Sequence, residues 1–238
     1  MPLGLPDAIT ACLFDLDGVL TSTAVLHRRA WKRTFDAFLT PRGEPPFTES
    51  DYVQYVDGRP RYDGVRAFLA SRRITLPEGT PADPPDADTV HGVGNRKNEL
   101  IEAIIRDEGV TPYPGTVRYL EAVRGRGLAI GVVTSSANAR KVLDAAGLSR
   151  FATALVDGVV IIRDGLRGKP APDSFLAGAR ELGVPPAHAA VFEDALAGVQ
   201  AGRAGDFGYV VGVDRANQRE ALRAHGADVV VEDLAELL

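Results

Sequence analysis

The chain has 238 residues, of which 45% are hydrophobic and 25% charged, a composition typical of a globular protein with a sizeable core. Its formal net charge of -5 and pI of about 5.4 argue against a nucleic acid or an anionic membrane as the main partner. A single cysteine, Cys12, excludes an intramolecular disulfide framework. No apolar run approaches the ~20 residues that cross a bilayer, and no secretory signal is visible. These features predict a cytoplasmic protein without a nucleic-acid or membrane partner.

The first predicted strand lies in ACLFDLDGVL (11–20), where an apolar run ends in Asp15 and Asp17. Burying carboxylates is costly, so this pair needs a physical explanation. Taken alone, such a pair most often forms a turn or a helix cap. Its meaning therefore depends on the rest of the chain.

The next segment, residues 24–110, is predicted to be helical. Apolar residues at helical spacing recur at 26–39, 62–72 and 97–109, and no strand pattern interrupts them. A Pro- and Asp-rich stretch at 77–89, called here the Pro–Asp loop, is predicted to be a loop within this segment. We therefore expect a helical insertion after the first strand.

From residue 128 onward, short apolar runs alternate with helical patterns. Predicted strands lie within 128–136, 189–194, 207–214 and 228–233, and predicted helices at 138–148, 171–183, 195–205 and 234–238. Asn138 is a predicted N-cap, and Gly147 and Gly183 are predicted at helix C-termini. Continuous apolar strands are typical of a parallel sheet that is covered on both faces.

The predicted fold class is α/β, with a Rossmann-like open parallel sheet as the core and an inserted α-helical cap domain. The predicted core comprises residues 1–22 and 114–238. The predicted cap comprises residues 23–113.

Polar side chains gather at the ends of the predicted strands. Because ligands bind at the carboxyl ends of parallel strands, we expect this set to meet in one place: Asp15, Asp17, Thr134, Ser135, Ser136, Glu193 and Asp194, with Lys169 from the segment before the 171–183 helix.

This combination of residues suits phosphoryl transfer. Carboxylate oxygens bind hard cations, and Mg²⁺ is the usual cation beside phosphate. A carboxylate next to Mg²⁺ and a lysine can attack phosphorus, and Asp17 could move the proton of the leaving or accepting oxygen. Thr134 and the helix N-terminus after it could donate hydrogen bonds to the phosphoryl oxygens. Alone, Glu193–Asp194 would be read as a cap and Lys169 as a solvated side chain; their joint occurrence favours catalysis.

Four motifs, DLDGV, VVTSS, GKPAP and FEDALAG, resemble those of the haloacid dehalogenase superfamily of phosphotransferases. With a helical cap after the first motif, the chain looks most like the β-phosphoglucomutase branch. The resemblance implies that Asp15 is the nucleophile, that Asp17 is the general acid/base, and that Thr134 and Lys169 bind the transferring phosphate. It also implies a Mg²⁺ ion held by Asp15, Asp17 (through its backbone carbonyl), Glu193 and Asp194. Ser135, Ser136 and Asn138 are the implied substrate-binding residues nearby.

The predicted cap resembles the same branch at three segments. TAVLHRRAW implies that His27 contacts substrate and helps control Asp17, with Trp31 beside it as a further substrate-binding residue. NRKNEL implies a sugar contact for Lys97, with Asn98 next to it. VDGRPRYDGV places Arg61 on the phosphate that is not transferred, with Arg59 nearby, and a guanidinium suits this role because it binds phosphate bidentately. The alternative readings are a packing histidine and two solvated arginines.

The chain departs from the branch at three places. Asp57 stands where the resemblance predicts a lysine, and Thr134 stands where serine is common. The Pro–Asp loop has no counterpart, and no function follows from its sequence.

The predicted activity is a phosphotransferase that interconverts β-D-glucose 1-phosphate and glucose 6-phosphate through an aspartyl phosphate and a 1,6-bisphosphate. Its predicted partner is a small sugar phosphate, and the predicted state is a monomer. The alternative is a Mg²⁺-dependent sugar-phosphate phosphatase, in which water accepts the phosphoryl group. A non-catalytic binding protein is a remote alternative, because it predicts a lost nucleophile or metal ligand and none is lost.

Overall fold

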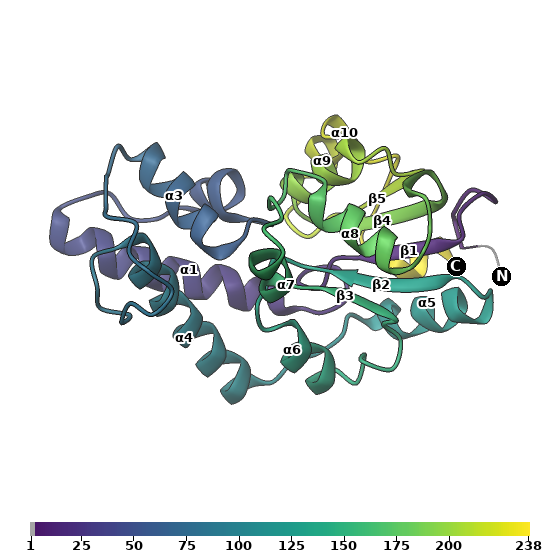
Figure 1. The fold of residues 1–238 in the computed structure, drawn as a ribbon, viewed down its shortest axis with the longest axis horizontal. Helices are drawn as coiled ribbons and strands as arrows, with labels where there is room; N and C mark the ends of the chain where they lie inside the picture. Colours follow the sequence, from purple (N-terminus) through teal and green to yellow (C-terminus); the bar gives the residue numbers. More distant parts are fainter. Residues whose placement is uncertain (1–2) are drawn as a thin grey trace. The chain divides into compact units, whose positions relative to one another are not determined.

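The computed structural model describes residues 3–238 and forms two compact units. One unit combines the chain up to Ser22 with Val110–Leu238, and the other is Thr23–Gly109 (Figure 1). The sequence placed the second boundary after residue 113, so the two divisions differ in where they put residues 110–113.

The first unit is built on a six-stranded parallel sheet in the order β3-β2-β1-β4-β5-β6. Its strands are β1 Ala11–Phe14, β2 Ala129–Val133, β3 Ala154–Val156, β4 Ala189–Glu193, β5 Tyr209–Val213 and β6 Val229–Val231. The sequence predicted all of these except β3. That strand has three residues, lies at the sheet edge and is soon followed by the apolar helix α7 (Gly158–Arg163), so hydrophobicity alone could not separate the two.

Helices cover both faces of this sheet (Figure 1). They are α5 Pro114–Gly125, α6 Ala139–Ala145, α8 Asp173–Glu181, α9 Leu196–Ala204 and α10 Arg219–Ala224, with 3₁₀ turns at Pro186–His188 and Leu234–Leu237. The closing helix predicted at 234–238 is thus a 3₁₀ turn, and α5 and α10 were not predicted.

Strand β1 is buried on both faces because its side chains alternate between two apolar layers. Leu13 packs in the layer that contains Phe175 of α8. On the other face, Phe14 stacks on Phe192 with ring centroids 4.3 Å apart and meets the edge of Tyr119 of α5 at 6.2 Å. The end of β1 is therefore a rigid support for the polar residues that follow it.

The second unit contains α1 Thr23–Leu39, a 3₁₀ turn Thr40–Arg42, α2 Glu49–Asp51, a π-helical turn Tyr52–Val56, α3 Arg61–Ser71 and α4 Val90–Glu108. Within residues 23–109 there is no strand, as predicted. Its core is aromatic: Phe35 lies 5.1 Å from Trp31, 4.9 Å from Phe47 and 4.2 Å from Phe68, centroid to centroid. Helix α4 begins well before the predicted residue 97, because the Thr89 side chain accepts a hydrogen bond from the Gly92 N–H and caps it.

The predicted helix ends are correct in part. Gly147 and Gly183 follow α6 and α8 with φ of 68° each, the left-handed conformation that glycine adopts without strain. Asn138 occupies the N-cap position of α6, as predicted, although its side chain makes no capping hydrogen bond there. Over residues 3–238, no helix is both long enough and apolar enough to cross a membrane.

The burial of Cys12 generates a test of this packing. Cys12 is 0% exposed in β1, and burial raises the pKa of its thiol far above the ordinary value. We expect the native protein to resist an aromatic disulfide reagent at about pH 8, where a free thiol of pKa about 8.5 would react. In guanidinium chloride, one thiol per chain should react, since the sequence has one cysteine. Rapid stoichiometric labelling of the native protein would contradict the buried position of β1.

Candidate active site

The motifs DLDGV and FEDALAG lie against each other at the carboxyl ends of β1 and β4. After Asp15 and Asp17 the chain turns at Gly18, which has φ of 98° and donates its N–H to the Thr21 carbonyl at 2.8 Å. The Asp194 carboxylate lies directly against this glycine: a Cβ at position 18 would stand 1.9 Å from Asp194 Oδ2. Only glycine fits here, and the close approach brings Asp194 to the turn that follows Asp15 and Asp17.

Lys169 joins these two motifs through a buried cluster of charges. Its ammonium donates to Asp15 Oδ1 at 2.6 Å, to Glu193 Oε1 at 2.5 Å and to the Val133 carbonyl at 3.2 Å. The Lys169 side chain is fully buried, and those of Asp15 and Glu193 are nearly so. All three donor positions of the ammonium are therefore used within the protein.

Burial and the neighbouring charges shift the pKa values of all three groups in this cluster. Burial raises the pKa of Asp15 to about 6, although the positive charge of Lys169 opposes that shift. Burial likewise raises the pKa of Glu193, again against Lys169. Burial would lower the pKa of Lys169, but the two carboxylates outweigh it and the net shift is upward. One lysine is shared by two carboxylates, so negative charge remains in excess at Asp15.

Glu193 is more deeply engaged in the protein than the sequence indicated. Its Oε1 accepts from Lys169, and its Oε2 accepts from the Ala195 N–H at 3.0 Å, just before α9. These contacts fix Lys169 and the start of α9. The predicted role of Glu193 as a metal ligand stays a prediction.

The second motif forms a tight turn after β2. Thr134 is 2% exposed, and its Oγ1 lies 3.4 Å from Asp17 Oδ2, to which it donates. The same hydroxyl accepts from the Ser136 N–H at 3.1 Å, and the Ser136 hydroxyl accepts from the Asn138 N–H at 3.2 Å. Ser135 is half-buried in this turn. Thr134 thus lies beside the acid/base candidate, at the sheet edge that also carries Asp15.

The donor set suits a divalent cation. Asp15, Asp17, Glu193 and Asp194 supply four carboxylates at this edge, against the single charge of Lys169. Between residues 3 and 238, no three His, Cys, Asp or Glu side chains converge closely enough to hold a metal ion alone. A cation here would therefore be held by one or two carboxylates, a backbone carbonyl and water, which is the coordination Mg²⁺ accepts beside phosphate.

Arg215 is a residue of this edge that the sequence analysis missed. It follows β5, donates from Nε to the Gly18 carbonyl at 2.7 Å and from Nη1 to the Glu232 carbonyl at 2.5 Å. Its guanidinium also lies 3.4 Å from the centroid of the Tyr113 ring. Arg215 therefore holds the turn after Asp17 in place. A lone arginine outside the four motifs gave no signal of this contact.

In the second unit, the structure brings His27, Trp31 and Lys97 together. Lys97 of α4 donates to His27 Nδ1 of α1 at 2.9 Å and lies 5.1 Å from the Trp31 ring centroid. Because an ammonium only donates, Nδ1 is the acceptor and Nε2 carries the proton of the neutral ring. Burial, reinforced by the charge of Lys97, lowers the pKa of His27 well below its ordinary value.

The remaining predicted cap residues are Trp31 on α1, Arg59 just before α3, Arg61 at the start of α3 and Asn98 on α4. Trp31 is 5% exposed and packs on Phe35, so its contacts support Lys97, and its predicted substrate contact stays a prediction. Arg59, Arg61 and Asn98 are half-buried. Arg61 donates from Nη2 to the Tyr62 hydroxyl at 3.2 Å.

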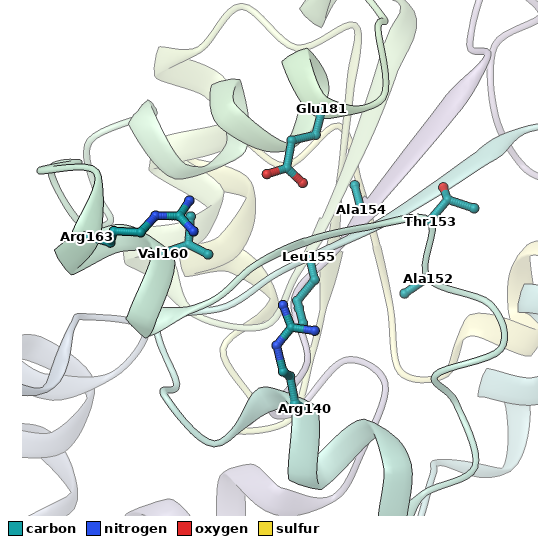
Figure 2. Close-up of a pocket in the computed structure, with 8 residues that line it drawn as sticks. All are labelled: Arg140, Ala152, Thr153, Ala154, Leu155, Val160, Arg163 and Glu181. Carbon is teal, nitrogen blue, oxygen red and sulfur yellow. The ribbon is translucent and has the colours of Figure 1, made fainter.

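A separate pocket of about 340 Å³ lies beside the edge strand β3 (Figure 2). It is lined by Arg140, Ala152, Thr153, Ala154, Leu155, Val160, Arg163 and Glu181. None of these is a predicted site residue, so the motifs and this pocket are different features of the first unit.

Comparison with known proteins agrees with the motifs. The family model for haloacid dehalogenase-like hydrolases matches residues 9–206. A β-phosphoglucomutase of Mycobacterium tuberculosis is 57% identical over 246 aligned positions, covering 99% of this chain and 94% of the relative. A β-phosphoglucomutase of Bacillus subtilis is 31% identical over 95% of this chain and 91% of its own length.

Solved structures give the same result. The crystal structure of a β-phosphoglucomutase from Clostridium difficile has a TM-score of 0.76 at 26% identity, covering 97% of this chain and 93% of that one. The predicted superfamily, fold class and branch are therefore confirmed. From the family match, the motifs and the parallel sheet that carries them, we conclude that the chain belongs to the haloacid dehalogenase-like hydrolase family.

Proposed function

We propose that this enzyme is a β-phosphoglucomutase that converts β-D-glucose 1-phosphate into glucose 6-phosphate through a phosphorylated Asp15. The observation that carries the proposal is the buried Asp15–Lys169–Glu193 cluster, with Thr134 and Asp17 beside it. The likeness to β-phosphoglucomutases over nearly the whole chain supports the same reading. We further propose that it acts as a cytoplasmic monomer on a small sugar phosphate.

The family implies a divalent metal, and we propose that it is Mg²⁺, held directly by Asp15, Asp194 and the Asp17 carbonyl. Glu193, the remaining predicted ligand, accepts hydrogen bonds at both carboxylate oxygens, so in this proposal it contacts the metal through water. When bound, it would offset the negative charge of the carboxylates and of the phosphoryl oxygens. Lys169 supplies a fixed positive charge at Asp15 Oδ1, and Thr134 offers a hydroxyl donor at the same edge. Asp15 can then approach phosphorus as a carboxylate without strong repulsion.

In this proposal Asp17 is the residue that donates and accepts the proton. Asp15 forms a bond to phosphorus while the bond from phosphorus to the sugar oxygen breaks, and Asp17 gives the departing oxygen its proton. In the reverse direction Asp17 takes the proton of the attacking sugar hydroxyl. The Thr134 hydroxyl near Asp17 Oδ2, and the turn held by Arg215, keep this carboxylate in position.

The mutase reaction requires two phosphate positions. The phosphorylated enzyme donates to the 6-hydroxyl of β-glucose 1-phosphate, and the bisphosphate then returns its 1-phosphate to Asp15. We propose that Arg61 holds whichever phosphate is not reacting and that Lys97 and His27 contact the sugar. A phosphatase of the same family, with water as acceptor, is the alternative.

The decisive measurement supplies β-glucose 1-phosphate, Mg²⁺ and a trace of glucose 1,6-bisphosphate. We expect glucose 6-phosphate without matching release of inorganic phosphate, because the phosphoryl group passes to the sugar. Asp15→Asn, which keeps the shape of the side chain, should lower turnover by at least about 10³-fold because the amide cannot form the aspartyl phosphate.

Two results would contradict the proposal. Inorganic phosphate released at the rate of substrate loss would identify a phosphatase. Normal turnover of Asp15→Asn, in protein with an unchanged circular dichroism spectrum, would remove Asp15 as nucleophile.

Arg61→Ala should separate sugar phosphates from simpler substrates. Loss of a charge-assisted fork to phosphate should lower kcat/KM for β-glucose 1-phosphate by roughly 10- to 100-fold. Hydrolysis of a small aryl phosphate, which has no second phosphate to hold, should change little. Arg106→Ala, at an exposed arginine near the end of α4, is the matched control and should leave both activities unchanged. An equal loss on both substrates in Arg61→Ala would argue against its proposed role.

The buried His27 predicts a pH dependence of stability. Its folded pKa lies well below 6.5, whereas the unfolded chain takes up this proton near about 6.5. The unfolded state therefore binds more protons below that pH, and the free energy of unfolding falls as pH drops from about 6.5. Each unit of separation between the two pKa values corresponds to about 1.4 kcal/mol.

His27→Gln should remove this part of the acid sensitivity. Urea unfolding between about pH 7.5 and about pH 5 should show a shallower loss of stability in the variant than in the wild type. His188→Gln, at an exposed histidine of the other unit, is the control and should follow the wild-type profile. A His27→Gln profile parallel to the wild type would mean that His27 is not held neutral in the folded chain.

A further inference from the structure

The Pro–Asp loop, residues 77–89, has a defined conformation in the structure. The Asp83 carboxylate accepts from the Thr80 hydroxyl at 2.9 Å and from the Thr89 hydroxyl at 2.6 Å. The Val90 N–H donates to the Pro77 carbonyl at 3.0 Å, which closes the loop onto the start of α4. The segment is therefore a fixed part of the second unit rather than a loose connection.

The loop orients the side chain of Asn95. Asn95 Nδ2 donates to the Pro81 carbonyl at 3.2 Å and to the Asp83 carbonyl at 2.8 Å, which uses both amide hydrogens. Its Oδ1 is then directed to the Tyr62 hydroxyl, which donates to it at 2.8 Å. Because that hydroxyl hydrogen is committed, the Tyr62 oxygen can only accept from Arg61 Nη2, at 3.2 Å. The direction of every hydrogen bond from the loop to Arg61 is thus determined.

The Tyr62 ring is also held on its faces. Its centroid lies 3.9 Å from that of His91, whose Nε2 is 3.4 Å from Glu78 of the loop. On α4, a Cβ at Gly94 would lie 2.7 Å from two carbons of the Tyr62 ring, so glycine allows this close approach. The Arg61 guanidinium lies 4.9 Å from the centroid of the same ring. Tyr62 is therefore a rigid support for Arg61.

The charges around Arg61 leave it available to an anion. Nearby carboxylates are engaged elsewhere: Asp63 and Glu78 both pair with Arg66. Across residues 3–238, no carboxylate pairs with Arg61, and its Nε is buried without a hydrogen-bond partner. A buried N–H of a guanidinium costs free energy when it is unpaired, so this atom favours an acceptor supplied by a ligand.

We infer that the Pro–Asp loop, Asn95 and Tyr62 are positioning elements that fix the Arg61 guanidinium as the binding fork for the phosphate that is not transferred. The inference rests on the proposed function, because it names the device that holds Arg61 in that role. Neutral partners orient the guanidinium without neutralising it, so the whole positive charge remains for the sugar phosphate.

A double-mutant cycle tests the inference. Tyr62→Phe removes the hydroxyl and keeps the ring, and we expect kcat/KM for β-glucose 1-phosphate to fall by about tenfold, mainly through KM, while aryl phosphate hydrolysis is unchanged. Asn95→Leu, which keeps the size and removes both hydrogen-bonding functions, should give a similar fall. In the Arg61→Ala background, Tyr62→Phe should change kcat/KM by less than about twofold, because there is no guanidinium left to position. Tyr55→Phe, at another partly buried tyrosine of this unit, is the matched control.

The outcomes separate the inference from the proposed function. Equal effects of Tyr62→Phe with and without Arg61 would overturn the inference, as would wild-type kinetics in both Tyr62→Phe and Asn95→Leu. A wild-type enzyme that does not turn over β-glucose 1-phosphate overturns the proposed function alone. Crystal structures of the wild type and Tyr62→Phe then decide the positioning directly. A single Arg61 rotamer in the wild type and several in Tyr62→Phe support the inference, and an unmoved guanidinium in the variant overturns it.

Discussion

The first unit depends on one buried ammonium, that of Lys169, which is shared by Asp15 and Glu193. Removing one partner from such a buried group typically costs about 3–5 kcal/mol, because it leaves an uncompensated charge in the interior. Asp15 follows β1, Glu193 ends β4 and Lys169 precedes α8, so three distant segments must dock accurately for any of the charges to be paired. The double-sided apolar packing of β1, with Phe14 stacked on Phe192, supplies the rigidity that this requires. The contact that holds Asp15, the proposed nucleophile, is thus also a condition for folding.

The sequence predicted the parallel sheet and the residues at its ligand edge because both follow from local pattern. An apolar run with acidic residues at its end predicts a strand and its polar terminus together, and strand order then brings distant termini to one edge. The contacts among these residues could not be predicted in the same way. Lys169 and Asp15 are 154 positions apart, and the double engagement of Glu193 depends on distances that only tertiary packing fixes. Arg215 was missed for the same reason, since its contact with the Gly18 carbonyl leaves no mark in the sequence around it.

The second unit shows a different limit of sequence reasoning. His27, Lys97 and Arg61 could be assigned by resemblance, because each lies in a segment that resembles the family. The Pro–Asp loop could not, because it acts on Asn95 through two backbone carbonyls, those of Pro81 and Asp83. Carbonyls are present at every position and carry no residue signature, so their direction is known only from the folded chain. The early start of α4 could not be predicted either, because glycines near its N-terminus lower its helix propensity. The Thr89 side chain stabilises this end by accepting a hydrogen bond from the Gly92 N–H.

Lys169 and Arg61 illustrate how partners determine what a buried cation can do. Lys169 is surrounded by two carboxylates and a carbonyl, so its charge is compensated before any ligand arrives and its donors are used. Lys169 can hold Asp15 in position and offset its negative charge. It has no donor left for a freely exchanging phosphate. Arg61 has the opposite environment, with a hydroxyl and an aromatic ring as its partners, an unpaired buried Nε and no carboxylate among its contacts in the described chain. Neutral partners fix its direction and leave its charge uncompensated, which is the condition for strong but reversible binding of an anion. The proposed reaction alternates two phosphates between a covalent site at Asp15 and a holding site at Arg61, and a reaction of this kind requires one cation of each type.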